Sequence, residues 1–393
     1  MEYISGLDLL ARSVKTISFN KSVSMMKIVS AKGLYQVAIL GLGVTLAGCG
    51  LLGIGGGKKG GDARGELVGA LNRPIFVMPL PYGMVPIPPG TFHMGQADED
   101  PASTQINFNK QVTIGPLFMD DSEITNNEYR QFTDFFLVDK VQLPDPFATP
   151  NEIDFKTKYY PDTTVWMKDF THHMGDPLVD YYWDHPGYKE YPVVGVNWEA
   201  AVFFGKWRTA FLNDWRKTNE GQPPVPSFRL PSEAEWEYAS RGGRDMAKYP
   251  WGNPYIRNSK GCMLANFKPG RGNYYDDGFE YTAPVGQYFP NDYGLLDMSG
   301  NVSEWCLDDF NPASVPTVWD LNPQFIDKNA YDKEGNSKEK YNARKVIRGG
   351  SWKDVAFYLE TGTRSYEYKD STRAYIGFRC VMTNIERSAV GGF

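Results

Sequence analysis

Two segments of the chain combine helix-capping residues with a helical repeat of apolar positions. In SEITNNEYRQFTDFF, Thr125 stands three positions before Glu128, and in RLPSEAEWEYASRGG, Ser232 stands three positions before Glu235. This is the spacing of a capping box, in which both side chains bond backbone N–H groups at the start of a helix. Gly242 is placed to end the second helix. The first helix has an aromatic face, which we expect in the core: Tyr129, Phe132 and Phe136.

A third helix is predicted from PVVGVNWEAAVFFGKWRTAFLNDWRK. The first residues form an apolar run typical of a buried strand, and Asn197 is placed to cap the helix that follows. Phe204, Trp207, Phe211 and Trp215 then form one stripe. Because all four side chains are large and apolar, we expect this helix to cross the core of the domain.

The remaining pattern predicts short strands joined by many turns. PYGMVPIPPGTFHMG alternates apolar residues with turn formers around Pro88, Pro89 and Gly90, and VIRGGSW and AYIGFRCVM are apolar, strand-like runs. Residues 138–191 lack clear periodicity, so we interpret them as a long insertion packed on its aromatic residues. Residues 311–343 are polar and predict a surface insertion.

Composition agrees with one loop-rich domain. Aromatic residues make up 15% of the chain, beside 40 glycines and 27 prolines, so large rings must hold many irregular segments. We predict a single domain over residues 81–384 and a tail over residues 385–393. The formal net charge is −6 and no basic run occurs, which argues against nucleic acid as a partner.

The N-terminal region has the parts of a secretory signal: Lys27 and Lys32, an apolar stretch over residues 34–47, and small residues before Cys49. Its end, LAGC, resembles the bacterial lipoprotein signal, in which the cysteine is lipidated and becomes the first residue of the mature protein. A short membrane anchor with an incidental cysteine is the alternative, but the apolar stretch is short for a membrane span. We predict lipidation of Cys49.

The signal peptide covers residues 1–48 and has an ordinary length if translation begins at Met25 or Met26 rather than at Met1. Residues 49–80 begin with the lipidated cysteine. They contain the stretch LLGIGGGKKGGDARGE, which we interpret as a flexible tether between the lipid and the domain.

Eight motifs follow one another along the domain: PPGTFHMG, EITNNEYRQF, YPVVGVNW, RLPSEAEWEYASRGG, YPWGN, NDYGLLDMSGNVSEW, VIRGGSW and YIGFRC. In this order they resemble the sulfatase-modifying-factor family, that of the formylglycine-generating enzyme. The resemblance covers nearly all of residues 81–384. It implies an α+β fold, the formylglycine-generating-enzyme or C-type-lectin-like arrangement, with sparse secondary structure.

Other segments resemble a smaller group of proteins that contain this domain. The lipoprotein start, GELVG, PYGMV, PDTTVW and GCMLANFKPGRG are similar to the GldK/PorK-type lipoproteins of gliding and type IX-secreting bacteria. This implies a non-catalytic lipoprotein on the periplasmic face of the outer membrane, self-associated in a ring and bound to a GldN/PorN-type periplasmic protein. Tyr181, Tyr182 and Trp183 are candidates either for anchors of such an interface or for the core.

Catalysis in the wider family depends on two cysteines shortly after the GGS turn. They bind copper, a soft metal that a thiolate pair suits. By the resemblance, the first of them corresponds to Asp354, three positions after Ser351, and no cysteine occurs between Cys306 and Cys380. We therefore expect no copper and no formylglycine-generating activity, with Ser351 and Asp354 in a vestigial cleft.

The resemblance also implies calcium at two turn-rich places. The corresponding residues are Asn266, Phe267, Asp277 and Phe279 in the first site, and Asp297, Gly300, Val302 and Glu304 in the second. Carboxylate and carbonyl oxygens are the ligands that Ca²⁺ prefers, and such ions can fix irregular loops. The alternative is that the same turns keep their geometry without a metal.

The resemblance leaves the disulfide state open. The cysteines that pair elsewhere in the family correspond here to Gly205 and Ser240, so Cys380 lacks its usual partner. Whether Cys262 or Cys306 takes that place is not determined by the sequence.

No other residues point to a catalytic mechanism. Asp308 and Asp309 are interpreted as surface residues rather than as an acid–base pair. The histidines are too few and too scattered to predict a metal site: His93, His172, His173 and His185. Two alternative functions remain, a lectin-like receptor that binds a ligand in the former catalytic cleft and an enzyme with unrecognised residues.

Overall fold

The structure is a computed structural model that describes the following residues: 78–96, 109–143, 149–169, 176–270, 274–327 and 344–385. Residues 73–393 make up one compact unit. The predictions for the signal peptide, for Cys49 and for most of the tether lie outside the described residues, as do His172, His173 and residues 328–343. Within the described ranges, no helix is both long enough and apolar enough to cross a membrane.

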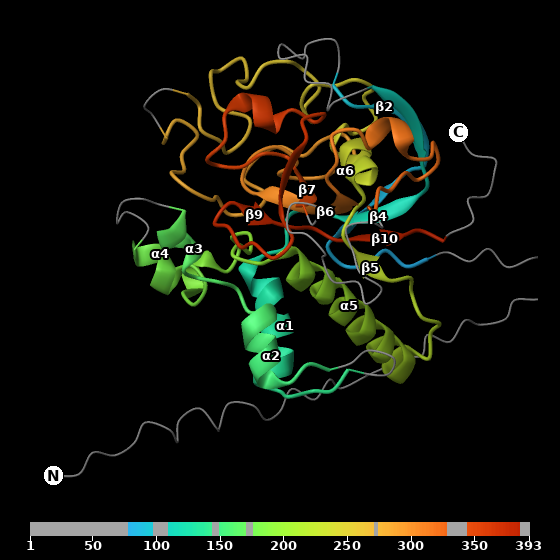
Figure 1. Cartoon of the computed structure of the whole chain (residues 1–393), viewed down its shortest axis with the longest axis vertical. Coiled ribbons are helices and arrows are strands. Elements are labelled where there is room, and N and C mark those ends of the chain that lie inside the picture. The colour runs from blue at the N-terminus through green and yellow to red at the C-terminus, as the bar shows by residue number, and fades with distance from the viewer. Residues whose placement is uncertain are drawn as a thin grey trace, which may run out of the picture. The chain divides into compact units, whose positions relative to one another are not determined.

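The helices of the described chain alternate with long irregular segments (Figure 1). They are α1 (Asn126–Leu137), α2 (Glu152–Lys158), α3 (Val165–Lys168), α4 (Asp176–Tyr181), α5 (Trp198–Trp215) and α6 (Glu233–Ser240). Short 3₁₀ turns cover Pro186–Tyr188, Val315–Thr317 and Ala356–Leu359, and a π turn, Arg216–Glu220, follows α5.

Both predicted capping boxes are confirmed. At the start of α1, the backbone N–H of Glu128 donates to the Thr125 hydroxyl, and the Glu128 carboxylate accepts from the Thr125 backbone. Ser232 and Glu235 form the same pair at α6. Gly242 adopts φ +60° just after α6, in the left-handed region that ends a helix.

The strands are short and form three sheets within the described residues. They are β1 (Met84–Ile87), β2 (Gly90–Met94), β3 (Lys110–Ile114), β4 (Leu117–Asp120), β5 (Phe228–Arg229), β6 (Ser303–Asp309), β7 (Arg344–Arg348), β8 (Ser365–Tyr368), β9 (Ile376–Gly377) and β10 (Val381–Thr383). The sheet orders are β1-β4-β10-β5, β2-β3 and β8-β7-β6-β9. Strands β6 and β9 are parallel, and the other pairs are antiparallel. The predicted mixture of helix and sheet with modest regular structure is confirmed.

Aromatic rings join α1 to α5 in the largest core cluster. The ring of Tyr129 stacks on Phe204 with centroids 5.5 Å apart, and Phe132 meets Phe204 edge-on at 5.6 Å. All three are buried, as the aromatic stripes of α1 and of the first half of α5 predict. Burying one such side chain contributes about 1.5–3 kcal/mol.

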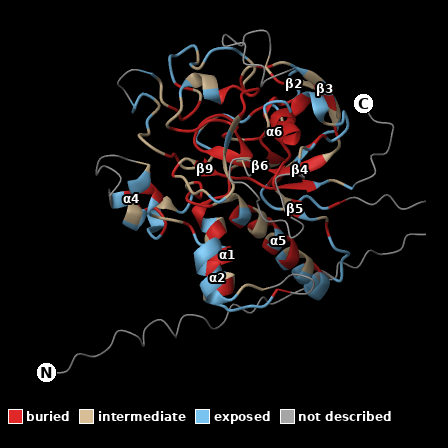
Figure 2. Ribbon diagram, viewed as in Figure 1, coloured by how far each residue is buried: buried red, intermediate tan, exposed pale blue. Residues whose placement is uncertain are grey.

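The prediction that α5 crosses the core holds only for the first half of the helix. Phe204 and Trp207 are buried, but Phe211 and Trp215 are 50% and 46% exposed. Figure 2 shows α5 becoming exposed toward its C-terminal end. The apolar run before it is buried but forms only an isolated bridge at Pro192 instead of a strand. The second half of the stripe therefore has no core to enter.

The insertion over residues 138–191 packs on its aromatic residues, as expected. Phe155, Trp166, Tyr182 and Trp183 are buried, whereas Tyr181 is 54% exposed. Tyr182 and Trp183 therefore belong to the core and are not interface anchors. The helices α2, α3 and α4 were not predicted, because four to seven residues are too few to show a helical repeat.

Asp308 and Asp309 are buried, so their interpretation as surface residues is wrong. The two oxygens of Asp308 accept from the backbone N–H groups of Glu233 and Phe325, which ties β6 to the start of α6. Burial, reinforced by the nearby charge of Glu233, raises the pKa of Asp308 to about 7. Asp309 forms a buried ion pair with Lys345 at 2.8 Å. Their partners are distant in sequence, so the local pattern gave no sign of burial.

Candidate functional site

The cleft predicted around Ser351 and Asp354 follows the end of β7. Gly349 and Gly350 adopt φ +92° and +68°, a conformation that L-residues with a side chain rarely adopt. A Cβ atom on Gly350 would also lie 2.8 Å from the carbonyl oxygen of Tyr358. The GGS turn therefore needs both glycines, and Gly350 allows the backbone of Tyr358 to approach closely.

Ser351 and Asp354 contact each other. The Ser351 hydroxyl donates to Oδ2 of Asp354 at 2.6 Å, and Ser351 is fully buried. Asp354 lies on the wall of a cavity of about 200 Å³, together with Lys353 and Tyr375. The carboxylate is thus a local hydrogen-bond acceptor at the place where the resemblance puts a metal-binding thiol.

The three described cysteines lie elsewhere and are unpaired. Cys262 is exposed, Cys306 and Cys380 are buried, and all three are free thiols, so neither candidate is bonded to Cys380. Burial raises the pKa of the Cys306 and Cys380 thiols. A thiol with a raised pKa carries little thiolate, the form that attacks substrates and binds metals. These two residues therefore pack as small apolar side chains.

The described histidines have structural partners. Nδ1 of His93 lies 2.7 Å from Oδ2 of Asp245 at the surface, and Nδ1 of His185 accepts from the backbone N–H of Gly187. Among the described residues, no three or more His, Cys, Asp or Glu side chains gather closely enough to hold a metal ion by themselves. A metal site built here must also use backbone or amide oxygens.

The first predicted calcium group is brought together by hydrogen bonds. Oδ2 of Asp277 accepts from the backbone N–H of Phe267 at 3.0 Å, and Oδ1 accepts from that of Phe279 at 3.2 Å. The Asn266 amide donates to the carbonyl oxygen of Tyr281 at 2.7 Å, which leaves its own Oδ1 as an acceptor. Burial raises the pKa of Asp277. The turn holds its shape through these bonds and keeps spare oxygen ligands.

The second predicted group contains a side chain that is already engaged. Glu304 is fully buried, and Arg379 donates to both of its oxygens, from Nε to Oε2 and from Nη2 to Oε1, each at 2.7 Å. Asp297 adopts φ +54° and accepts from Gly286 at 2.6 Å, while Gly300 adopts φ +83°. Glu304 is therefore first of all the counter-ion of Arg379, a role that was not predicted.

Glu123 is a buried carboxylate beside this second group. Its Oε1 accepts from the Asn301 amide at 3.2 Å, whereas no donor reaches its Oε2. Burial and the charge of Asp297 raise the pKa of Glu123, and burial raises that of Asp297 to about 6. Val302, the buried neighbour of Asn301, completes the predicted group. Two neighbouring buried carboxyl groups with raised pKa values can share a proton through a hydrogen bond, and the same arrangement fits a bound cation. Only its place just before the capped helix marks Glu123 in the sequence.

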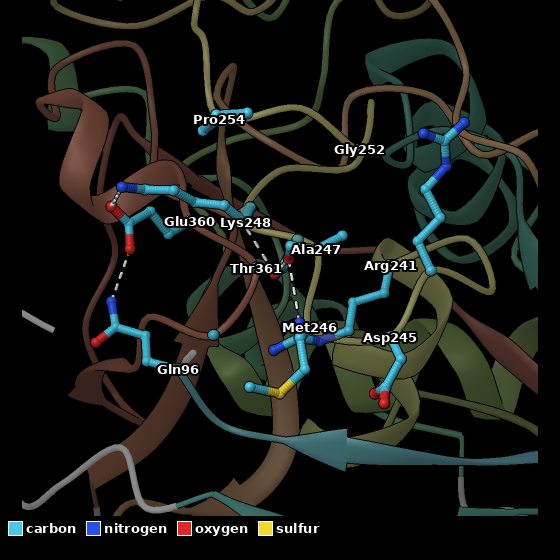
Figure 3. A pocket seen from close by; sticks show the side chains of 12 residues that line it. Gln96, Arg241, Asp245, Met246, Ala247, Lys248, Gly252, Pro254, Glu360 and Thr361 are labelled. Atoms are coloured by element: carbon cyan, nitrogen blue, oxygen red, sulfur yellow. Dashed lines mark hydrogen bonds and ion pairs between the residues drawn. The ribbon is translucent and has the colours of Figure 1, made fainter. Parts of the chain in front are cut away.

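A separate cavity of about 460 Å³ lies beside the start of the segment that follows α6 (Figure 3). Its polar side chains bond one another. Glu360 accepts from Gln96 at 2.8 Å and pairs with Lys248 at 3.3 Å, and Arg241 donates to the carbonyl oxygen of Ala247 at 3.1 Å. Figure 3 shows these groups turned toward each other. The cavity wall is thus held together by its own charges.

Comparison with known proteins agrees with the eight motifs. Residues 78–384 match the family model "Sulfatase-modifying factor enzyme 1-like domain". The formylglycine-generating enzyme of Mus musculus is 28% identical over 323 residues, covering 77% of this chain and 75% of the mouse protein. The "Inactive C-alpha-formylglycine-generating enzyme 2" of Bos taurus is 27% identical over 325 residues, covering 76% and 87%.

The fold also has a counterpart among solved structures. PvdO from Pseudomonas aeruginosa aligns with a TM-score of 0.51 and 20% identity, covering 77% of this chain and 94% of PvdO. At this identity the likeness concerns the fold. Because the family model spans most of the sequence, from the first described strand to the last, the chain belongs to the family of sulfatase-modifying factor enzyme 1-like domains.

Proposed function

We propose that this protein is a non-catalytic outer-membrane lipoprotein of the periplasmic ring of the type IX secretion and gliding machinery. The observation that supports the non-catalytic part is Asp354, which by the family resemblance corresponds to the first copper-binding cysteine. Its carboxylate is bound to the Ser351 hydroxyl at 2.6 Å. A single carboxylate does not replace the thiolate pair that a soft metal prefers. The bovine relative named as inactive offers a parallel for a family member without this activity.

An activity assay tests this part directly. The full chain, loaded with copper, is incubated with a cysteine-containing sulfatase peptide, and aldehyde formation is followed by mass spectrometry. An active formylglycine-generating enzyme serves as the positive control. We expect no aldehyde from this chain. Aldehyde formation that is lost in an Asp354→Asn variant would overturn the proposal, because it would make Asp354 part of a working catalytic site.

The proposal places the protein on the periplasmic face of the outer membrane, anchored by lipid on Cys49. Residues 49–80 then tether the domain to the membrane. The test is a Cys49→Ser variant followed by membrane fractionation. We expect the wild-type chain in the outer-membrane fraction, and mass spectrometry of its N-terminal peptide should show the added mass of the lipid. The Cys49→Ser variant should be absent from the outer-membrane fraction. Equal membrane retention of both forms would contradict lipid anchoring.

Assembly in the ring needs an exposed contact surface, and α5 supports one. Phe211 and Trp215 are about half exposed on successive turns, and Tyr82, 99% exposed, lies beside Phe211 on a groove of about 280 Å³. Exposed aromatic side chains of this kind are typical anchors of protein interfaces. We propose this face for contacts with neighbouring copies or with the GldN/PorN-type periplasmic protein.

The native size of the protein, extracted gently from its own envelope, tests the assembly. We expect a particle far larger than the 44.3 kDa chain, with one abundant periplasmic companion. A Phe211→Asp/Trp215→Asp variant should lose the large particle, and a Tyr255→Asp variant, at a more exposed aromatic residue distant in sequence, should keep it. Recovery of the wild-type protein as a monomer would reject the ring assignment.

Calcium in at least one of the two turn groups is part of the same proposal. It is supported by the unpaired Oε2 of Glu123 beside Asp297 and by the spare oxygens around Asp277. The C-type-lectin-like description of the fold also belongs to the proposal, supported by small sheets joined by long irregular segments. When bound, the ion would neutralise buried carboxylates and fix these turns.

A further inference from the structure

A cavity of about 560 Å³ adjoins the Ser351–Asp354 cleft and is distinct from the one in Figure 3. Lys353 and Tyr375 line both this cavity and the cleft, and the other wall comes from the end of α3, in the long insertion. A volume of this size falls within the range of about 300–1,000 Å³ that small-molecule sites occupy. The insertion thus contributes Lys168 and Asp169 to a second cavity next to the Ser351–Asp354 cleft.

The charge of this cavity is opposite to that of the protein. Its walls contain four basic side chains and two carboxylates, in a chain with a formal net charge of −6. Lys168 and Arg373 pair with carboxylates at 2.6 and 2.8 Å. Lys268 and Lys353, in contrast, form no ion pair with any described residue. Two ammonium groups therefore line one cavity without a direct ion pair, although the charges of Asp354 and Asp169 lie near Lys353.

The two lysines are held near each other and over aromatic rings. The backbone N–H of Lys268 donates to the carbonyl oxygen of Asp354, the neighbour of Lys353, at 2.9 Å. Nζ of Lys353 lies 3.0 Å from the ring centroid of Tyr375, and Nζ of Lys268 lies 5.1 Å from that of Tyr274. Burial lowers the pKa of Lys353, as expected for an ammonium group taken partly out of water. The rings thus fix both cations while leaving them able to meet an anion.

The remaining walls define what else the ligand must carry. Trp352 and Tyr281 meet edge to face at 5.3 Å and provide an apolar surface. Asp169 and Glu280 line the same cavity. Asp169 accepts from the backbone N–H of Ala374 and pairs with Arg373 at 3.5 Å, and Glu280 accepts from the Tyr275 hydroxyl, so each carboxylate can still take further hydrogen bonds. They would repel a ligand that is negative all round, but they would accept hydrogen bonds from hydroxyl groups.

We propose that this cavity binds an acidic sugar, with its carboxylate on Lys268 and Lys353, its hydroxyl groups on Asp169 and Glu280, and an apolar ring face toward Trp352. A phosphate or a simple carboxylate meets only the lysines and is opposed by the two acidic side chains. A neutral sugar leaves both ammonium groups without a partner. A ligand that combines a carboxylate with hydroxyl groups satisfies all of these walls.

Isothermal titration of the full chain with glucuronic acid, glucose, inorganic phosphate and an acidic peptide tests the proposal. We expect saturable binding of glucuronic acid, tighter than that of each other probe by about tenfold or more, the effect of one charge-assisted hydrogen bond. Lys353→Met and Lys268→Met, which keep the apolar stem, should each weaken glucuronic acid binding by about tenfold. Lys206→Met, at an exposed lysine of α5, is the matched control and should bind like wild type.

Three results would overturn the proposal. Equal binding of glucose and glucuronic acid would show that the carboxylate is not recognised. Tighter binding of phosphate or of the acidic peptide would exclude a sugar as the preferred ligand. Absence of saturable glucuronic acid binding, or equal weakening by Lys206→Met, would remove the site itself. Far-ultraviolet circular dichroism of every variant checks that the fold is kept. None of these outcomes bears on the size of the assembled particle, so the ring proposal is tested independently.

Discussion

Replacing Glu304 by glutamine should destabilise the protein strongly, because Arg379 would lose its counter-ion in the core. Both side chains are fully buried, and the guanidinium donates two hydrogen bonds of 2.7 Å to the carboxylate. Trp236 donates a third bond to the same carboxylate at 2.8 Å. Glutamine keeps the shape but removes the charge, and its amide N–H groups face these donors. Arg379 is also held by the carbonyl oxygen of Leu296, so it has no easy route to water.

The expected size of the effect follows from the geometry. Removing one member of a buried ion pair costs about 3–5 kcal/mol, because the other charge stays buried without compensation. The free energy of unfolding of a typical domain is about 5–15 kcal/mol, so this single change removes a large part of it. The double variant Glu304→Gln/Arg379→Met removes both charges of this ion pair. It should therefore lose at least about 1 kcal/mol less than the sum of the two single variants.

Urea unfolding followed by tryptophan fluorescence measures these losses, once with a calcium chelator and once with calcium chloride. The matched control is Glu199→Gln, which removes an ion pair with Lys369 at 2.9 Å. Glu199 is half exposed, so its loss should cost no more than about 1 kcal/mol. A loss below about 1 kcal/mol for Glu304→Gln would refute the reasoning about the buried pair. A loss seen only with calcium would assign Glu304 to the metal instead.

Three further predictions follow from burial and charge. The pKa of Asp308 is about 7 in the folded chain against an ordinary value of 3.8, so its stabilising contribution is complete below about pH 4 and is lost as the pH rises through 7. Asp308→Asn should therefore flatten the fall in the free energy of unfolding between about pH 4 and pH 8. An unchanged pH slope in urea titrations would contradict this. Phe204→Ala should lower the free energy of unfolding by about 3–5 kcal/mol, and Phe211→Ala, at a half-exposed residue, by less than about 1 kcal/mol. Equal shifts of the urea midpoint would contradict the conclusion that the core ends between Phe204 and Phe211. Calcium added to chelated protein should raise the Tm. The turn that binds the ion is the one whose variant, Asp277→Asn or Asp297→Asn, reduces this rise in Tm. A Tm independent of calcium would reject the proposed ions.

The sequence by itself determined the elements whose contacts are local. A capping box joins residues three positions apart, so Thr125 with Glu128 and Ser232 with Glu235 were recognisable before any fold was known. The aromatic repeat of α1 likewise marks its buried face, because a helix brings every third or fourth residue to one side. The ordered motifs predicted the family in the same way, as a series of short segments.

The tertiary structure alone decided where the long-range partners lie. Glu304 and Arg379 are 75 positions apart, and Asp308 caps the helix that begins at Glu233, also 75 positions away. No local repeat encodes such pairs, so two buried aspartates looked like surface residues, and the pairing of Glu304 with Arg379 was not predicted.

The same reason explains the errors along α5 and the cavity beside the cleft. The aromatic stripe from Phe204 to Trp215 is uniform in sequence, but only the end that meets α1 and the sheets finds a core. Lys268 and Lys353 come from separate loops, and their shared cavity exists only because the chain brings those loops together. Periodicity shows which side of a helix is apolar, while the packing of distant segments decides how much of that side is buried and which charges are left to bind a ligand.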